Sequence, residues 1–278
     1  MPSRHIVAIG GSDAGISAAL RARELDPNTD FTVVVADAYP NFSICGIPYY
    51  VSGEVTHWTK LAHRTAEDLA ATGMTVLTDT RATRINSDAH TLEILDVDGA
   101  ARHLEYDALI VGTGAISSRP PLRGLSGQGA LGPKDGVHLL HSMGDTFEVM
   151  DSLTTRDPAS AVIIGAGYIG LEMAEALTAR GVAVTQVEAL PEVLPTVDRE
   201  LGAVIRVELE RNGVEVLTDT TVAAIIGVSE AAAIMRTIIE NETGTLVVFF
   251  IFALGFVILT LPVGVGFTEL SKRLAVKR

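Results

Sequence analysis

The sequence has few cysteines and few basic residues, and it lacks metal-ligand spacing. It holds one cysteine, Cys45, among 278 residues, so a scaffold of intrachain disulfides is excluded. Basic residues are few, with 21 Lys and Arg against 34 Asp and Glu and a net charge of −13. Such an acidic chain repels a phosphate backbone, so we expect no nucleic-acid partner. No His, Cys and Asp residues follow metal-ligand spacing, so we expect no metal site.

One long apolar run contrasts with this acidic composition. Leu246–Phe267 contains no charged residue and is followed by a basic cluster at Lys272, Arg273, Lys277 and Arg278. As a helix it would span about 33 Å, close to the roughly 30 Å of a bilayer's hydrocarbon core. A buried core helix is the alternative, but such helices are usually amphipathic. We predict a transmembrane helix with a basic tail over residues 244–278.

The first forty residues predict a strand, a helix and a second strand. Between the first strand and the helix lies "GGSDAG", in which Gly10 and Gly15 match the dinucleotide pattern G-x-G-x-x-G while Ser12 replaces its middle glycine. Asp37 follows Gly15 by 22 residues, near the end of the second strand. A carboxylate at that place can bind ribose hydroxyls. The unit therefore predicts a dinucleotide site.

The same unit recurs near residue 160 with a complete pattern. "SAVIIGAGYIGLEMAEALTARGVAVTQVEAL" supplies Gly165, Gly167 and Gly170, and Glu188 follows 18 residues after the last glycine. Glycines let the backbone approach phosphate, and the helix N-terminus stabilises its negative charge. An acid at the strand end accepts hydrogen bonds from a 2′-hydroxyl and repels a 2′-phosphate, so NADH is favoured over NADPH.

A third segment lies between the two units. The buried strand expected at Ala108–Val111 ends in Gly112-Thr113-Gly114. Small residues there let a chain pass close to a ligand, although an ordinary strand exit has the same appearance. This segment alone does not decide between the two.

Together these segments resemble the pyridine nucleotide–disulfide oxidoreductases, and in particular their single-cysteine branch of coenzyme A-disulfide reductases and NADH oxidases and peroxidases. "CG-PY" of that branch is matched by Cys45, Gly46, Pro48 and Tyr49, and "ATGA" by "GTGA" at Gly112–Ala115. The resemblance covers about residues 4–225. It implies an α/β chain with two Rossmann-like units, one for FAD over residues 1–125 and one for NAD(P)H over residues 126–225.

The resemblance also implies the site residues. Those for FAD are Gly10, Gly15, Asp37, Thr113 and Gly114, and those for NAD(P)H are Gly165, Gly167, Gly170 and Glu188. Tyr168 and Glu172 match positions that border the nicotinamide and the flavin.

The resemblance makes Cys45 the redox centre, which reacts with a small disulfide such as coenzyme A disulfide. A thiolate beside a flavin can form a mixed disulfide or be oxidised to a sulfenic acid, so an NADH oxidase or peroxidase is the alternative. Those relatives usually have a histidine where this chain has Asp13, which disfavours a sulfenate. Asn41 and Ile44 also depart from the reductases. A packed structural cysteine is the remaining alternative.

The tail departs from this family pattern. After about Ile225 we expect neither the returning FAD segment nor the C-terminal homodimer domain, and residues 226–243 predict a linker or amphipathic helix. "LTLPVG" and "SKRLAVKR" resemble the last helix of an amino-acid ABC transporter permease. These features predict a truncated or fused, membrane-associated chain with its catalytic body in the cytoplasm. A catalytically inactive, membrane-tethered remnant is the contrasting hypothesis.

Overall fold

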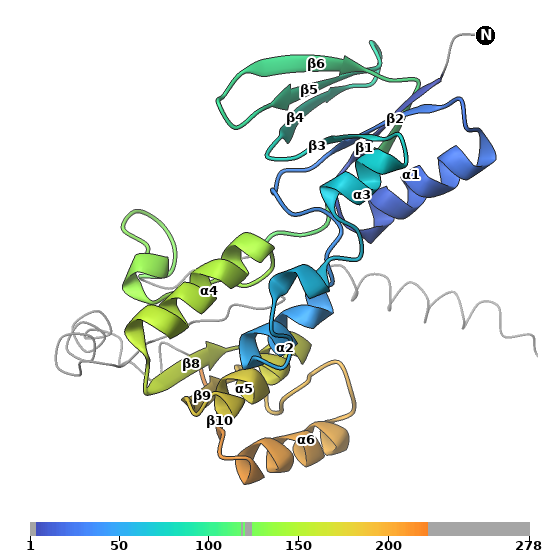
Figure 1. Ribbon diagram of the computed structural model, residues 1–278. Coiled ribbons are helices and arrows are strands. Elements are labelled where there is room, and N and C mark those ends of the chain that lie inside the picture. The colour runs from blue at the N-terminus through green and yellow to red at the C-terminus, as the bar shows by residue number, and fades with distance from the viewer. Residues whose placement is uncertain (1–3, 118, 120–123, 222–278) are drawn as a thin grey trace, which may run out of the picture. The chain divides into compact units, whose positions relative to one another are not determined.

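The computed structural model describes residues 4–117, 119 and 124–221 (Figure 1). The chain forms two compact units. Unit 1 comprises Met1–Ile47, Val55–Ala115 and Ser142–Gly144, and unit 2 comprises Pro48–Glu54, Ile116–His141 and Asp145–Arg278. The main stretch of unit 1 ends at Ala115, and Pro48–Glu54, shortly after Cys45, belongs to unit 2.

Unit 1 is built on a four-stranded parallel sheet with the order β3-β2-β1-β7. Its strands are β1 (His5–Ile9), β2 (Asp30–Val34), β3 (Thr75–Leu77) and β7 (Ala108–Val111). Helix α1 (Asp13–Leu25) follows β1, and helix α3 (Ala66–Ala71) precedes β3. Side chains of α1, α3, the first two strands and the residues that flank β2 and β3 form one core cluster: Ala8, Ile16, Ala19, Phe31, Val33, Val35, Leu69 and Met74. Branched apolar residues favour the strands, and burial of the apolar side of α1 holds the helix on the sheet.

A second, antiparallel sheet belongs to the same unit. It consists of β4 (Arg81–Asn86), β5 (Thr91–Leu95) and β6 (Ala101–Glu105), in that order. Figure 1 shows it on the opposite side of the parallel sheet from α1. A core cluster joins the two sheets: Val7, Ile9, Val34, Leu92, Ile94 and Tyr106. Unit 1 thus has three layers.

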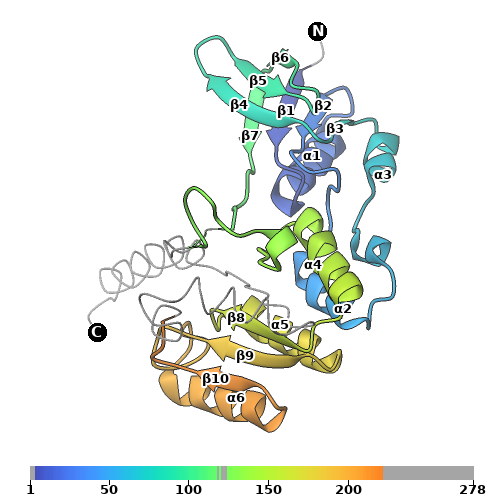
Figure 2. The same cartoon turned by 90° about the vertical axis from the view of Figure 1, so that its left-hand side faces the viewer.

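Unit 2 repeats the strand–helix–strand plan. Its parallel sheet has the order β10-β9-β8, formed by β8 (Ser160–Ile164), β9 (Ala183–Val187) and β10 (Glu215–Leu217). Helix α5 (Tyr168–Ala179) follows β8, and α6 (Arg199–Arg211) precedes β10 and runs along it (Figure 2). Helix α5 buries Gly170, Met173, Ala174, Ala176 and Leu177. The prediction of an α/β chain with two such units is confirmed.

Five further elements complete the described chain, four of them short. They are η1 (Ile44–Gly46), α2 (Ile47–Ser52), η2 (Trp58–Leu61), η3 (Pro133–Asp135) and α4 (Met143–Arg156). Arg180, at the end of α5, donates from Nε to the carbonyl oxygen of Val51 and from Nη2 to Met150 Sδ at 3.8 Å. The bond to Val51 ties α2 to the end of α5 within unit 2.

The predicted tail lies outside the described residues. This applies to the linker at residues 226–243, to Leu246–Phe267 and to the rest of residues 244–278. Among the residues that the structure does describe, no helix has the length and apolar character needed to cross a membrane. The transmembrane helix over residues 244–278 therefore stays a prediction.

Candidate functional site

The glycine turn of unit 1 lies against the end of β7. Gly10 has φ 108°, and a Cβ atom there would stand 1.9 Å from the carbonyl oxygen of Gly112. A Cβ at Gly15 would stand 2.4 Å from the carbonyl oxygen of Gly10. Both positions therefore need glycine. Exposed Thr113 and Gly114 follow directly, so the segment whose meaning the sequence left open passes beside the glycine turn.

The glycine turn of unit 2 has the same construction. Gly165 has φ 99°, and a Cβ at Gly170 would stand 2.1 Å from the Gly165 carbonyl oxygen. Gly167 is the N-cap of α5, and a Cβ there would have nothing within 4 Å. The space beside Gly167 is therefore open, and a phosphate group there could accept hydrogen bonds from the first backbone N–H groups of α5.

Matching hydrogen bonds fix which residues of the two units are equivalent. In unit 1 the Gly10 N–H donates to Val34 O, and in unit 2 the Gly165 N–H donates to Val187 O, both at 2.8 Å. One residue farther along, the Val35 N–H donates to Leu77 O and the Glu188 N–H to Leu217 O, again both at 2.8 Å. Val35 is therefore the equivalent of Glu188. The sequence assigned that place in unit 1 to Asp37, which stands two residues farther on and accepts a 3.2 Å hydrogen bond from the Tyr39 N–H.

Glu188 is the strand-end carboxylate of unit 2. Its side chain is buried, with one oxygen accepting from the Ala166 N–H at 2.8 Å and the other from the Leu190 N–H at 2.9 Å. A carboxylate has about four lone-pair sites, so acceptor capacity is left for ribose hydroxyls. In unit 1 the equivalent space holds Val35, whose Cγ1 would lie 2.7 Å from a Cβ at Gly11. Only unit 2 has a carboxylate at this place.

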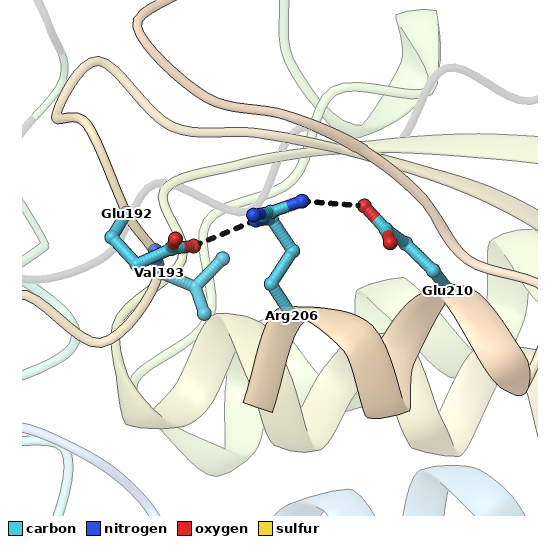
Figure 3. Close-up of polar contacts among 4 residues, drawn as sticks. All are labelled: Glu192, Val193, Arg206 and Glu210. Carbon is cyan, nitrogen blue, oxygen red and sulfur yellow. Dashed lines mark hydrogen bonds and ion pairs between the residues drawn. The ribbon is translucent and has the colours of Figure 1, made fainter. Parts of the chain in front are cut away.

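The loop after Glu188 is fixed to the turn and to α6. The Leu194 N–H donates to the Ala166 carbonyl oxygen at 2.7 Å. Glu192, which is buried, accepts from Arg206 Nε at 2.9 Å, and Arg206 Nη1 donates to Glu210 at 3.1 Å (Figure 3). These two carboxylates, Glu192 foremost, raise the pKa of the Arg206 guanidinium. The ion pair therefore keeps this loop beside the glycine turn of unit 2.

Tyr168 and Glu172 lie on the first turns of α5. Tyr168 is 55% exposed, and Glu172 is partly buried four residues later, so both project from one side of the helix. Burial, followed by repulsion from Glu175, raises the pKa of the Glu172 carboxyl. The two side chains stand just beyond the glycine turn, and their place beside the nicotinamide and the flavin stays a prediction.

Cys45 lies in η1 and is exposed, so the structure excludes a packed core cysteine. Its segment is bound to the rest of unit 1 by three backbone hydrogen bonds. Asn41 N–H donates to Gly11 O at 2.7 Å. Ser43 N–H donates to Leu61 O at 2.7 Å and His63 N–H to Asn41 O at 2.8 Å, and these two form a β-bridge between Phe42 and Ala62. The thiol therefore stands four residues from a contact with the glycine turn. The sequence alone did not reveal this attachment.

The glycine turns and the strand-end carboxylate fit dinucleotides with anionic phosphates. Within residues 4–117, 119 and 124–221, no three His, Cys, Asp or Glu side chains are placed to hold a metal ion together. A comparison with protein families matches residues 4–268 to the family described as "Pyridine nucleotide-disulphide oxidoreductase". The match extends past residue 225, where the sequence analysis ended the resemblance, so the predicted truncation and the permease-like tail are not confirmed.

Curated relatives agree with this family. An NADH oxidase of Methanocaldococcus jannaschii is 27% identical over 82% of this chain and 50% of its own length. An NAD(P)H sulfur oxidoreductase (CoA-dependent) of Pyrococcus abyssi is 32% identical over 75% of this chain and 45% of its own. A coenzyme A disulfide reductase of Staphylococcus haemolyticus is 28% identical over 74% of this chain and 45% of its own length. The chain thus spans about half the length of the curated relatives it matches.

A solved structure supports the same fold. Reduced CoADR-RHD of Bacillus anthracis has a TM-score of 0.79 at 26% identity, covering 95% of this chain and 46% of its own. The family and these relatives support FAD and NAD(P)H as cofactors. With two glycine turns, an exposed cysteine and a family match over most of its length, the chain belongs to the pyridine nucleotide-disulphide oxidoreductase family.

Proposed function

We propose that this chain is part of an FAD-dependent oxidoreductase that passes electrons from NAD(P)H to a small-molecule disulfide, such as coenzyme A disulfide, through Cys45. One observation carries the proposal: the only cysteine is exposed, and its segment is hydrogen-bonded to the glycine turn of unit 1. Relatives named coenzyme A disulfide reductase and NAD(P)H sulfur oxidoreductase (CoA-dependent) support the substrate class.

The proposed chemistry balances as NAD(P)H plus a proton plus one disulfide giving NAD(P)⁺ and two thiols. FAD, when bound, supplies two-electron transfer between nicotinamide and sulfur. The Cys45 thiolate attacks one sulfur of the substrate, its disulfide bond breaks, and the departing thiolate takes up a proton. The resulting mixed disulfide with Cys45 accepts two electrons and a proton, which releases the second thiol and restores the thiolate.

The side chains of unit 2 give the proposal a coenzyme preference. Glu188 can accept hydrogen bonds from ribose hydroxyls, while its negative charge repels a 2′-phosphate. Because its carboxylate already holds the Ala166 N–H of the glycine turn, it has little freedom to move aside for NADPH. NADH is therefore the proposed coenzyme. A single thiol and a nicotinamide coenzyme suit a reducing compartment, and we place this body in the cytoplasm.

The second candidate is an NADH oxidase or peroxidase that uses a Cys45 sulfenic acid. The relative from Methanocaldococcus jannaschii, which is named NADH oxidase, favours it. Against it, α1 begins with Asp13, whose carboxylate would repel a sulfenate in the same unit. The third candidate, an inactive remnant, predicts a purified protein without flavin.

The experiment follows NADH oxidation by the purified full chain, extracted with detergent if needed. Coenzyme A disulfide is tested first without oxygen, and oxygen or peroxide is then tested without disulfide. The proposal predicts turnover that requires the disulfide. Equal turnover with oxygen or peroxide would replace it with the oxidase, and colourless protein after expression with ample flavin would favour the remnant.

A further inference from the structure

A polar cluster of four residues lies at the start of α1 in unit 1. Asn41 Nδ2 donates to Asp13 Oδ1 at 2.9 Å, and His63 Nδ1 lies 3.5 Å from the same oxygen. Arg64 Nη1 stands 3.5 Å from Asn41 Oδ1. The family resemblance explained none of these contacts. Asn41 is the centre of the cluster, because it contacts Asp13 and Arg64 through its side chain and binds the His63 N–H through its carbonyl oxygen at 2.8 Å.

Asn41 is an unusual residue for its surroundings. Its side chain is 1% exposed, and its φ of 52° lies in the left-handed region. Leu194 is its equivalent in unit 2, with φ 49°. Each donates its N–H to the glycine turn at 2.7 Å, Asn41 to Gly11 O and Leu194 to Ala166 O. The backbone arrangement therefore does not require an amide side chain, and the amide has a task that exists in unit 1 alone.

That task concerns the charge of Asp13. This residue opens α1, next to the N–H groups that would face the FAD pyrophosphate, and its equivalent in unit 2 is the uncharged Tyr168. A free carboxylate there would repel a pyrophosphate group. The structure instead turns the carboxylate toward an N–H donor from Asn41 and toward His63. The hydrogen bond from Asn41 thereby fixes the direction in which the Asp13 carboxylate points.

We propose that Asn41 is a positioning residue for FAD, which holds the Asp13 carboxylate so that unit 1 accepts the FAD pyrophosphate. The inference rests on the proposed binding of FAD by unit 1. Because Asn41 also begins the segment that leads to Cys45, the same residue connects the cofactor turn with the stretch that carries the thiol.

The test is FAD affinity, measured by flavin fluorescence on the full chain after removal of its flavin. Asn41→Asp keeps the shape of the side chain but turns its donor into a second carboxylate facing Asp13. We expect the Kd for FAD to rise about tenfold, the effect of losing one hydrogen bond to a charged group. The double variant D13N/N41D restores a donor–acceptor pair and should return the Kd to within about twofold of wild type.

Asn86→Asp is the matched control. Asn86 is an exposed residue of β4 in the same unit, and its Oδ1 accepts the Ala89 N–H at 3.0 Å, which a carboxylate can also do. The added charge is the same, so the Kd should change less than about twofold. If N41D does not fold, Asn41→Leu places the unit 2 residue there, and its defect should likewise be relieved by D13N.

Two results would overturn the inference while leaving the proposed function intact: wild-type affinity in N41D and N41L, or a loss of affinity that D13N does not relieve. The second result would show that the amide only supports the loop. A wild-type chain that binds no FAD would overturn both proposals together.

Discussion

Val35 and Glu188 occupy equivalent positions in the two units, each directly after a central parallel strand with its N–H donating to the next strand at 2.8 Å. One is an apolar side chain packed on Gly11, and the other is a buried carboxylate that holds the Ala166 N–H. The two nucleotide turns therefore share a backbone but differ in charge. Only unit 2 has a carboxylate at the strand end, which we propose selects the ribose.

Glu188→Gln tests this selection. The amide removes the charge and one acceptor, so NADH should bind about tenfold more weakly, while NADPH loses little because its 2′-phosphate is no longer repelled. The measurement is the Kd of each coenzyme from the fluorescence of its reduced nicotinamide. Glu215→Gln is the control, since its carboxylate only accepts from Thr185 Oγ1 at 2.8 Å on the exposed side of β10. An equal loss for both coenzymes would contradict the assignment.

Gly10→Ala tests the close approach of β7 to the glycine turn. The added Cβ would stand 1.9 Å from a backbone oxygen at φ 108°, so strain and overpacking act together. We expect a loss of about 3 kcal/mol or more in the free energy of unfolding, with loss of bound flavin. Gly99→Ala is the control, because φ is 81° there and nothing lies within 4 Å. It should cost about 1 kcal/mol and keep the flavin. Equal effects would show that φ alone matters at Gly10.

His138 predicts a loss of stability in acid. The imidazole is 1% exposed, and neither ring nitrogen has a hydrogen-bond partner in the described part of the chain. Burial, followed by the charge of Arg156, lowers its pKa from 6.5 to about 4. Below pH 6.5 His138 is protonated in the unfolded chain but stays neutral in the folded chain. The free energy of unfolding therefore falls between pH 6.5 and about pH 4. The full effect is about 3 kcal/mol.

His138→Leu should remove this part of the pH dependence and leave stability at pH 7 unchanged or higher, because an unpaired polar group is replaced by an apolar one. Urea unfolding at pH 5 and pH 7 measures it. His103→Leu, at an exposed position of β6, is the comparison and should keep the wild-type slope. A pH dependence that persists in His138→Leu would place its origin in other groups.

Arg206→Ala should loosen the loop beside the turn of unit 2. Glu192 would remain buried without its ion-pair partner, and we expect a loss of about 2 kcal/mol in unfolding free energy with weaker NADH binding. Arg211→Ala, on the same helix, breaks a 3.5 Å pair with Glu208 whose side chains are 72% and 65% exposed. It should cost less than about 0.5 kcal/mol. Thermal or urea unfolding measures the loss of stability in both variants. Equal losses would contradict the claim that the Glu192–Arg206 ion pair holds the loop in place.

The sequence predicted much of this arrangement because local physics determines it. Gly10, Gly15, Gly165 and Gly170 stand where backbone atoms approach too closely for a Cβ, and a glycine pattern makes such places visible in a sequence. The two strand–helix–strand units follow from apolar periodicity in the same way. The prediction that Cys45 is the redox centre came from the family resemblance, because the spacing of residues alone did not indicate it.

Other features depended on tertiary contacts. Asp37 was assigned to the strand end from its spacing of 22 residues after Gly15, but the hydrogen-bond register places Val35 there. The antiparallel sheet from β4 to β6 has mostly exposed residues in β4 and β6, which weakens its apolar alternation in the sequence. Asn41 was seen only as a departure from the reductases. Its proposed role depends on contacts with Asp13 and Arg64, which lie 28 and 23 residues away from it in the sequence.

The most direct test of the whole account uses Cys45→Ser in the full chain loaded with FAD. NADH added without oxygen should bleach the flavin in this variant as it does in wild type, because the nucleotide turns are untouched. Addition of coenzyme A disulfide should then restore the flavin colour and release thiol in wild type alone. Thiol release by Cys45→Ser at the wild-type rate would contradict the account.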